Sequence, residues 1–121
     1  LKEYIKGKRK FKIASDQFFS PLFIRDLIRI IDFFIKKKIN GIFNIGGNLS
    51  NSRFNFIKKF FNYLNIKDAK LEKISIESFD NGLHIPKNVS FDIKKLKKKI
   101  NFKLSKFPYN LKKLKDVYKK Y

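Results

Sequence analysis

The sequence contains no cysteine and a single histidine, His84, among its 121 residues. Disulfides, thiolate zinc sites and cysteine nucleophiles are therefore excluded, and so is a metal site built from several histidines. Acidic residues are also scarce, with 10 Asp and Glu against 30 Lys and Arg. These carboxylates are scattered, so His84 has no acidic partner at a fixed spacing and is interpreted as a surface or hinge histidine.

Long apolar runs are missing as well. The most apolar stretch, residues 22–35, is interrupted by four charged residues, whereas a membrane-spanning helix needs roughly 20 mostly apolar ones. No apolar segment follows the charged N-terminus, so we expect no signal peptide and a cytoplasmic protein without a membrane partner. The chain starts at Leu1 and contains no methionine, which favours a fragment cut from a longer protein.

The net charge of +20 would ordinarily indicate a polyanionic partner. However, Lys, Ile, Phe, Asn and Tyr supply 74 of the 121 residues, and the codons of all five begin with two A or T bases. An AT-rich genome explains this bias more simply than selection for polyanion binding. The lysines near the C-terminus alternate with apolar positions, as on solvated amphipathic helices, and no RNA-type stacking motif accompanies them. Nucleic acid is therefore an unfavoured partner.

Apolar periodicity predicts an α/β fold in which short strands alternate with amphipathic helices. The expected strands are 10–13, 42–45 and 69–76, and the expected helices are 21–38, 53–64, 93–100 and 111–121, with a further helix ending at Gly7 and a chain break at Pro108. Residues 15–21 and 78–88 are expected to be loops. The whole chain, residues 1–121, is expected to form a single unit.

Helix starts and buried faces follow from the same pattern. Ser20 is expected to cap the first long helix and Pro21 to occupy its first turn, while residues 50–52 and Asp92 are expected to cap the next two. The buried stripe of the first long helix is expected to be Phe23, Leu27, Ile30, Ile31 and Phe34.

Few residues suggest chemistry directly. The sequence has neither a G-x-G-x-x-G turn nor a P-loop. Gly41 and the pair Gly46-Gly47 are interpreted as turn glycines. Tyr4 and Lys8 have the tyrosine-three-lysine spacing of short-chain dehydrogenases, but Gly7 interrupts the helix that such a pair needs. We therefore predict no catalytic residue and no metal site in this chain.

The most distinctive segment is the loop at residues 15–21. Asp16, Gln17, Phe18 and the pair Ser20-Pro21 resemble an Asp-Gln-Phe-Gly-Ser-Pro-like loop of the extended short-chain dehydrogenase/reductase family, in particular the dTDP-4-dehydrorhamnose reductase group. Phe19 stands where that family commonly has Gly, and Leu22 where it commonly has Thr.

Later segments extend the resemblance over nearly the whole chain. Asp26-Leu27 is similar to the Asp-Leu of the family's helix, and residues 41–46 to its Gly-Ile-Tyr-His-like strand. Residues 86–92 are similar to its Arg-Pro-x-Asn stretch. Ile85 stands where Arg usually precedes Pro86, which puts a contact to the nucleotide or to a neighbouring loop in question.

The resemblance implies the distal, substrate-binding portion of an extended Rossmann-type reductase. The missing upstream part would bind NADP or NAD and carry the catalytic residues, so the fragment alone would be inactive. The substrate would be a nucleotide-diphosphate sugar with a 4-keto group, used in cell-surface polysaccharide precursor synthesis, and a homodimer is compatible with this interpretation. The residues nearest the substrate would be Gln17, Ser20, Pro86 and Asn88.

Several alternatives stay open. Within the family, the full protein could be a sugar-nucleotide epimerase, a dehydratase or a non-catalytic regulatory subunit. In a different class, the chain could be a small basic nucleic-acid-binding domain. The predicted site residues could also be structural, with Ser20 only capping a helix and Asp16 and Gln17 only bonding the loop backbone.

Overall fold

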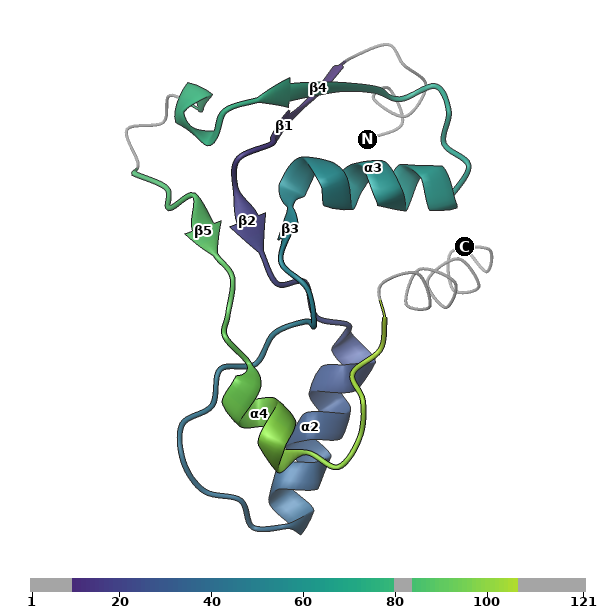
Figure 1. The fold of residues 1–121 in the computed structure, drawn as a ribbon. Helices are drawn as coiled ribbons and strands as arrows, with labels where there is room; N and C mark the ends of the chain where they lie inside the picture. Colours follow the sequence, from purple (N-terminus) through teal and green to yellow (C-terminus); the bar gives the residue numbers. More distant parts are fainter. Residues whose placement is uncertain (1–9, 80–83, 107–121) are drawn as a thin grey trace.

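A computed structural model describes residues 10–79 and 84–106 of the chain (Figure 1). The expected N-terminal helix, the Tyr4–Lys8 pair, the break at Pro108 and the final helix lie outside these residues. Within the described part, no helix is both long and apolar enough to cross a bilayer. The fold is mixed α/β, as the sequence predicts, with short strands and helices alternating along the chain.

One end of the molecule is built from a parallel strand pair and a helix. Strand β1 (Lys10–Ala14) pairs in parallel with β4 (Lys70–Ile74). Helix α3 (Arg53–Tyr63) lies beside this pair (Figure 1), and Phe61 of α3 contacts Phe11 of β1 edge to face, with ring centroids 5.3 Å apart. The strands at 10–13 and 69–76 are thus confirmed in outline, although Ile76 itself begins a short 3-10 helix, η1 (Ile76–Ser78).

A second sheet joins three two-residue strands in the middle of the molecule. Strand β2 (Phe18–Phe19) pairs antiparallel with β3 (Asn51–Ser52) and in parallel with β5 (Asn88–Val89). The sequence indicated a loop at β2, because two residues are too short to display a strand period. This sheet brings the loop at 15–21 against two segments that are distant in sequence.

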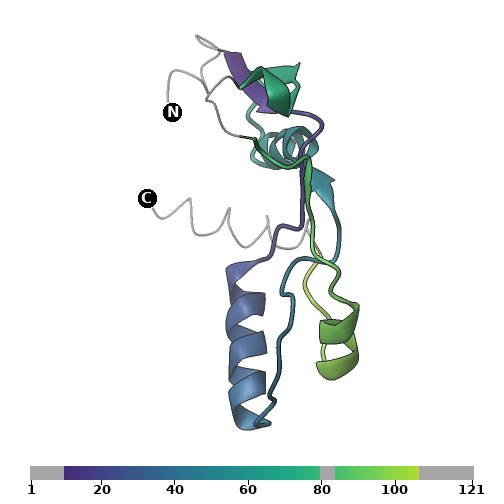
Figure 2. The same cartoon turned by 90° about the vertical axis from the view of Figure 1, so that its left-hand side faces the viewer.

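The opposite end holds helices α2 (Ile24–Lys36) and α4 (Lys94–Lys99), as Figures 1 and 2 both show. Its apolar core is made of Ile30, Ile93, Leu96, Ile100 and Leu104. The helix expected at 93–100 is present in outline, and its apolar residues Ile93, Leu96 and Ile100 all lie in this core. The residue that precedes α4 is Ile93, one position after the expected cap at Asp92, and it provides no side-chain cap. Asp92 still bonds to the first residue of the helix, since its Oδ1 accepts a hydrogen bond of 2.8 Å from the backbone N–H of Lys94.

The start of α2 differs from the prediction. The helix begins at Ile24, and the residue that precedes it, Phe23, has extended backbone and provides no side-chain cap. Ser20 instead accepts a 3.2 Å hydrogen bond through Oγ from the N–H of Phe91. The expected cap at Ser20 is wrong because residues 20–22 lie outside the helix and have no regular structure, and they lie close to Gly46 and Gly47. Ser52, by contrast, caps α3 as expected, accepting from the N–H of Asn55 at 3.2 Å.

The predicted strand at 42–45 is absent, and this segment has no regular structure. Its backbone is held by side chains instead: Lys95 Nζ donates to the carbonyl oxygen of Ile42 at 2.8 Å. No strand of the described residues pairs with it, and the Ile42 side chain is 88% exposed. The alternating apolar pattern therefore predicted a strand wrongly, because no strand of the described residues pairs with this segment.

Candidate functional site

The loop at 15–21 is where the predicted site residues meet. Its carboxyl, amide and hydroxyl side chains each bond to a different segment of the chain. Asp16 bonds to the end of β4, Gln17 to the segment before β5, and Ser20 to the segment after β5. The predicted site therefore lies at the junction between the two ends of the molecule.

Gln17 is buried at this junction, with only 4% of its surface exposed. Its Nε2 donates to the carbonyl oxygen of Pro86 at 3.4 Å, and its Oε1 accepts a hydrogen bond from Nε of Arg53. The backbone carbonyl of Gln17 also accepts from the N–H of Arg53 at 3.0 Å. Both ends of the amide are thus used within the chain, and Gln17 fixes two neighbouring segments in place.

Arg53 is the site residue that sequence reasoning missed. It is the first residue of α3, its side chain is exposed, and its guanidinium carbon lies 5.2 Å from the centre of the Phe19 ring. Composition contained one signal that could have pointed to Arg53. The chain has only four arginines against 26 lysines, so each arginine departs from the strong preference for lysine.

Asp16 anchors the start of the loop. Its Oδ2 accepts from Oγ of Ser75 at 2.6 Å, and its Oδ1 accepts from the N–H of Ile76 at 2.7 Å. These bonds, the hydroxyl bond first, hold the pKa of Asp16 below its ordinary value of 3.8 because they favour the charged carboxylate. The role of Asp16 in this structure is to tie the loop to the end of β4.

The segment before and within β5 is held against the loop by its backbone. The N–H of Phe18 donates to the carbonyl oxygen of Lys87 at 2.7 Å, and Phe18 lies opposite Asn88 in the β2–β5 register. Asn88 Oδ1 accepts from the N–H of Ser90 at 2.9 Å, which forms a local turn. The structure therefore brings Gln17, Pro86 and Asn88 together, with Pro86 and Asn88 both exposed.

A salt bridge stabilises the same segment. Lys87 Nζ lies 2.8 Å from Oε1 of Glu77, and this hydrogen bond raises the pKa of Lys87 above its ordinary value of 10.5. Both side chains are more than half exposed, so the pair contributes little to stability.

Ser20 lies on the other side of the loop. Its carbonyl oxygen accepts from the N–H of Gly47 at 3.2 Å, and Gly47 is so close to Pro21 that a Cβ built there would lie 1.9 Å from the Pro21 carbonyl oxygen. Gly47 is therefore needed for close backbone approach. Gly41, with a φ of +119°, is the turn glycine that the sequence predicted.

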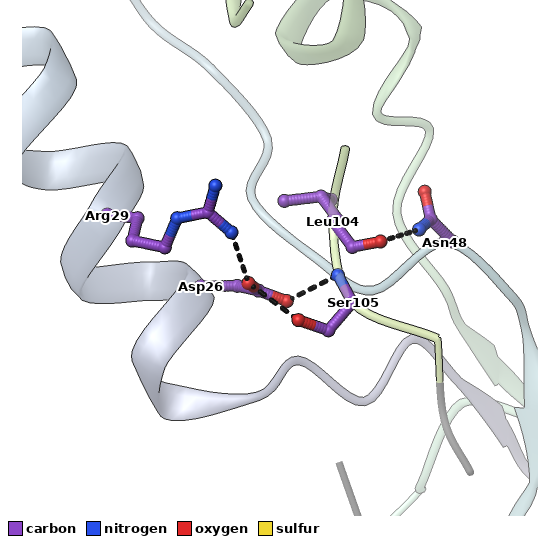
Figure 3. Close-up of polar contacts among 5 residues, drawn as sticks. All are labelled: Asp26, Arg29, Asn48, Leu104 and Ser105. Atoms are coloured by element: carbon purple, nitrogen blue, oxygen red, sulfur yellow. Dashed lines mark hydrogen bonds and ion pairs between the residues drawn. The ribbon is translucent and has the colours of Figure 1, made fainter. Parts of the chain in front are cut away.

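A buried charge below the loop holds the other end of the molecule together (Figure 3). Asp26 of α2 is only 2% exposed, and its carboxylate accepts from the N–H of Ser105 at 2.7 Å and from Oγ of Ser105 at 3.0 Å. Nη1 of Arg29 lies 3.4 Å from Oδ1 of Asp26 and forms an ion pair with it. A buried carboxylate must be paired and hydrogen-bonded, and Asp26 has such partners on the inner side of its helix. Asp26 therefore has a structural role.

The remaining candidates do not join the site. His84 is exposed and makes no hydrogen bond to another residue of the described ranges. Residues 10–79 and 84–106 contain no group of three or more His, Cys, Asp or Glu side chains that could hold a metal ion. A surface depression lies between the end of α3 and β4, and none of the predicted site residues lines it.

Comparison with known proteins gives a consistent result. The family model described as the RmlD substrate binding domain matches residues 1–120. A search of curated proteins found no match.

Solved structures of similar fold share one activity in their names. A dTDP-4-dehydrorhamnose reductase from Bacillus anthracis, in complex with NADP, is 25% identical to this chain, with a TM-score of 0.78 over 90% of this chain and 39% of that one. A dTDP-4-dehydrorhamnose reductase from Clostridium acetobutylicum gives 23% identity and a TM-score of 0.81 over 91% and 39%. One from Yersinia enterocolitica gives 19% and 0.79 over 97% and 41%. The chain thus spans about two fifths of the length of these structures.

Proposed function

The chain belongs to the family of RmlD substrate-binding domains, and on that basis we propose that it forms the substrate-binding part of an NADP-dependent reductase acting on a 4-keto deoxysugar nucleotide. The observation that carries the proposal is the family match over residues 1–120. The similar fold of three dTDP-4-dehydrorhamnose reductases, one of them in complex with NADP, supports the same activity and the same cofactor type.

The proposal includes a longer protein in which this chain is the C-terminal part. The similar solved structures are about 2.3 times as long, since 90% and 91% of this chain cover 39% of two of them. An exposed apolar stripe on α2 supports the same arrangement, because a stripe of this kind normally packs against another part of a protein. It consists of Ile24, Ile28, Ile31 and Ile35, each between 48% and 71% exposed.

The proposed binding wall is the loop at 15–21 together with residues 86–88. Pro86 and Asn88 are exposed and lie directly beside the loop, so they are free to contact a sugar nucleotide. Gln17 is buried and positions the residues next to it. Ser20 accepts a hydrogen bond from the N–H of Phe91 and so holds the backbone after β5 beside the loop, at the edge of the proposed wall.

NADP, when bound, supplies the hydride that reduces the 4-keto group. The sequence has no G-x-G-x-x-G turn with which to hold a dinucleotide, so the cofactor is proposed to bind to the upstream part of the reductase. The residues of this chain would hold the nucleotide end of the substrate and thereby orient the keto carbon toward the cofactor. This chain by itself is accordingly expected to be inactive.

The test is an activity assay on the full-length gene product. Its upstream reading frame should encode a Gly-rich βα turn and a Tyr-x-x-x-Lys, and the purified protein should oxidise NADPH when dTDP-4-dehydrorhamnose is added. Turnover of the sugar nucleotide without NADPH consumption would instead indicate an epimerase or a dehydratase. Absence of turnover combined with salt-dependent binding to any DNA duplex would favour the nucleic-acid-binding alternative.

A further inference from the structure

Arg53 is an exposed arginine whose orientation is fixed from three directions. Its Nε donates to the buried amide oxygen of Gln17, its backbone N–H donates to the carbonyl oxygen of the same residue, and its guanidinium lies over the ring of Phe19. An exposed arginine ordinarily keeps most of its rotamer freedom, which is costly to lose. Here a buried glutamine is used to restrict it.

The charge of Arg53 is not used inside the described structure. No Asp or Glu of residues 10–79 and 84–106 forms an ion pair with it. Arg29 offers the contrast, because its guanidinium pairs with Asp26 at 3.4 Å and stacks 4.2 Å from the ring centre of Phe102. Arg29 therefore has a structural role, whereas Arg53 is held in place with its two terminal amino groups available.

The choice of arginine at this position is itself informative. The chain contains 26 lysines and only four arginines, so a lysine would satisfy a general need for positive charge. Only the planar guanidinium can donate through Nε to Gln17 and still present two parallel N–H groups on its far edge. That edge matches the oxygens of a phosphate group, which it can bind with two hydrogen bonds at once.

We infer that Arg53, positioned by Gln17, binds the diphosphate of the nucleotide-sugar substrate. The inference rests on the proposed function, since it assigns an anionic group of that substrate to a residue of the same wall. Gln17 also bonds to Pro86, so the guanidinium is tied to the segment that carries Pro86 and Asn88. Gln17 is accordingly a positioning residue, and Arg53 is the residue that touches the ligand.

The experiment measures dTDP binding by calorimetry and steady-state kinetics on the full-length gene product. Arg53→Gln should weaken dTDP binding and raise KM for the sugar nucleotide about tenfold to a hundredfold, because charge-assisted hydrogen bonds to phosphate are lost. KM for NADPH should stay close to wild type. Arg53→Lys keeps the charge but loses the paired N–H groups, so its loss of affinity should be intermediate.

Arg25→Gln is the matched control. Arg25 is an exposed arginine of α2 that forms no ion pair with another described residue, and its substitution removes the same charge away from the site. It should bind dTDP as wild type does. Wild-type affinity in Arg53→Gln, or an equal loss in Arg25→Gln, would overturn the inference while leaving the proposed function standing. A wild-type protein that binds neither dTDP nor the sugar nucleotide would overturn both.

Discussion

At the scale of single residues, the loop at 15–21 is organised by the side chain of Gln17. The family resemblance implied that this residue lies next to the substrate, and the structure gives it a buried position with both amide groups bonded. Such a residue affects the site through the segments that it fixes. Its substitution should therefore change both stability and substrate affinity.

We predict that Gln17→Ala lowers the free energy of unfolding by about 1–2 kcal/mol, because two partly buried hydrogen bonds are lost. In the full-length protein it should also raise KM for the sugar nucleotide, since Arg53 is no longer held. Urea denaturation and steady-state kinetics measure the two effects. Asn62→Ala, which removes an exposed amide of α3, should change neither value. A lower stability with an unchanged KM would mean that Gln17 is purely structural.

The cap of α3 gives a second prediction at this scale. Ser52→Ala should cost about 1 kcal/mol of stability, because the N–H of Asn55 loses its hydroxyl acceptor at the helix start. Thermal or urea unfolding measures the loss. Ser78→Ala, at an exposed position, should be neutral, and an equal loss in both variants would contradict the capping role.

Asp16 predicts a pH dependence. Its pKa is lowered in the folded protein by the hydroxyl of Ser75 and the N–H of Ile76, so folding favours the charged carboxylate. The stabilisation is complete well above the unfolded-state value of about 3.9 and is lost as the pH falls through the lower folded-state pKa. The difference in unfolding free energy between wild type and Asp16→Asn should therefore shrink on acidification. A difference that stays constant as the pH falls would contradict this role of Asp16.

At the scale of elements, helix α2 carries three different faces. Asp26 and Ile30 point to the core, the charged residues lie on another side, and the isoleucine stripe at 24, 28, 31 and 35 is exposed. The sequence predicted the helix, but of its expected buried stripe only Ile30 is buried, whereas Phe23, Leu27 and Phe34 are half-buried. It misplaced Ile31, which is 48% exposed, because a helix with apolar residues on two adjacent faces does not reveal which face meets the core.

An exposed apolar stripe favours association, so we expect the isolated chain to self-associate through the stripe on α2. Ile28→Lys combined with Ile35→Lys should reduce self-association, as measured by sedimentation, with little change in the free energy of unfolding, because both side chains are exposed. Ile30→Ala should instead cost about 2–5 kcal/mol, because that side chain is fully buried. Unchanged association in the double variant would mean that the stripe is not the associating surface.

Short elements mark the limit of the sequence analysis. The strands β2, β3 and β5 have two residues each, so no alternation could reveal them. The predicted start of α2 was wrong. Ser20 and Pro21 are residue types that favour a helix start, but here they lie outside the helix, where Pro21 closely approaches Gly47. The longer strands β1 and β4 and the cap at Ser52 follow from local pattern and are confirmed.

At the scale of the whole molecule, the parts that sequence analysis could not supply are contacts between distant segments. The resemblance of residues 16–21 and 86–92 to one family pointed to a common site, and the structure brings both segments together through Gln17 and the β2–β5 pairing. Arg53 was missed because its relation to Gln17 spans 36 positions of sequence and follows no short motif. Family membership and the fold were accessible from the sequence, whereas the residue that completes the proposed site required the structure.

The central claim is that the loop at 15–21, Arg53 and residues 86–88 form the wall that binds the nucleotide sugar. The most direct measurement is a crystal structure of the full-length gene product with NADP and dTDP bound. We predict that the diphosphate of dTDP lies within hydrogen-bond distance of the Arg53 guanidinium and that the nucleotide rests against Pro86 and Asn88. A dTDP molecule bound elsewhere, with Arg53 facing solvent or a protein carboxylate, would contradict the account.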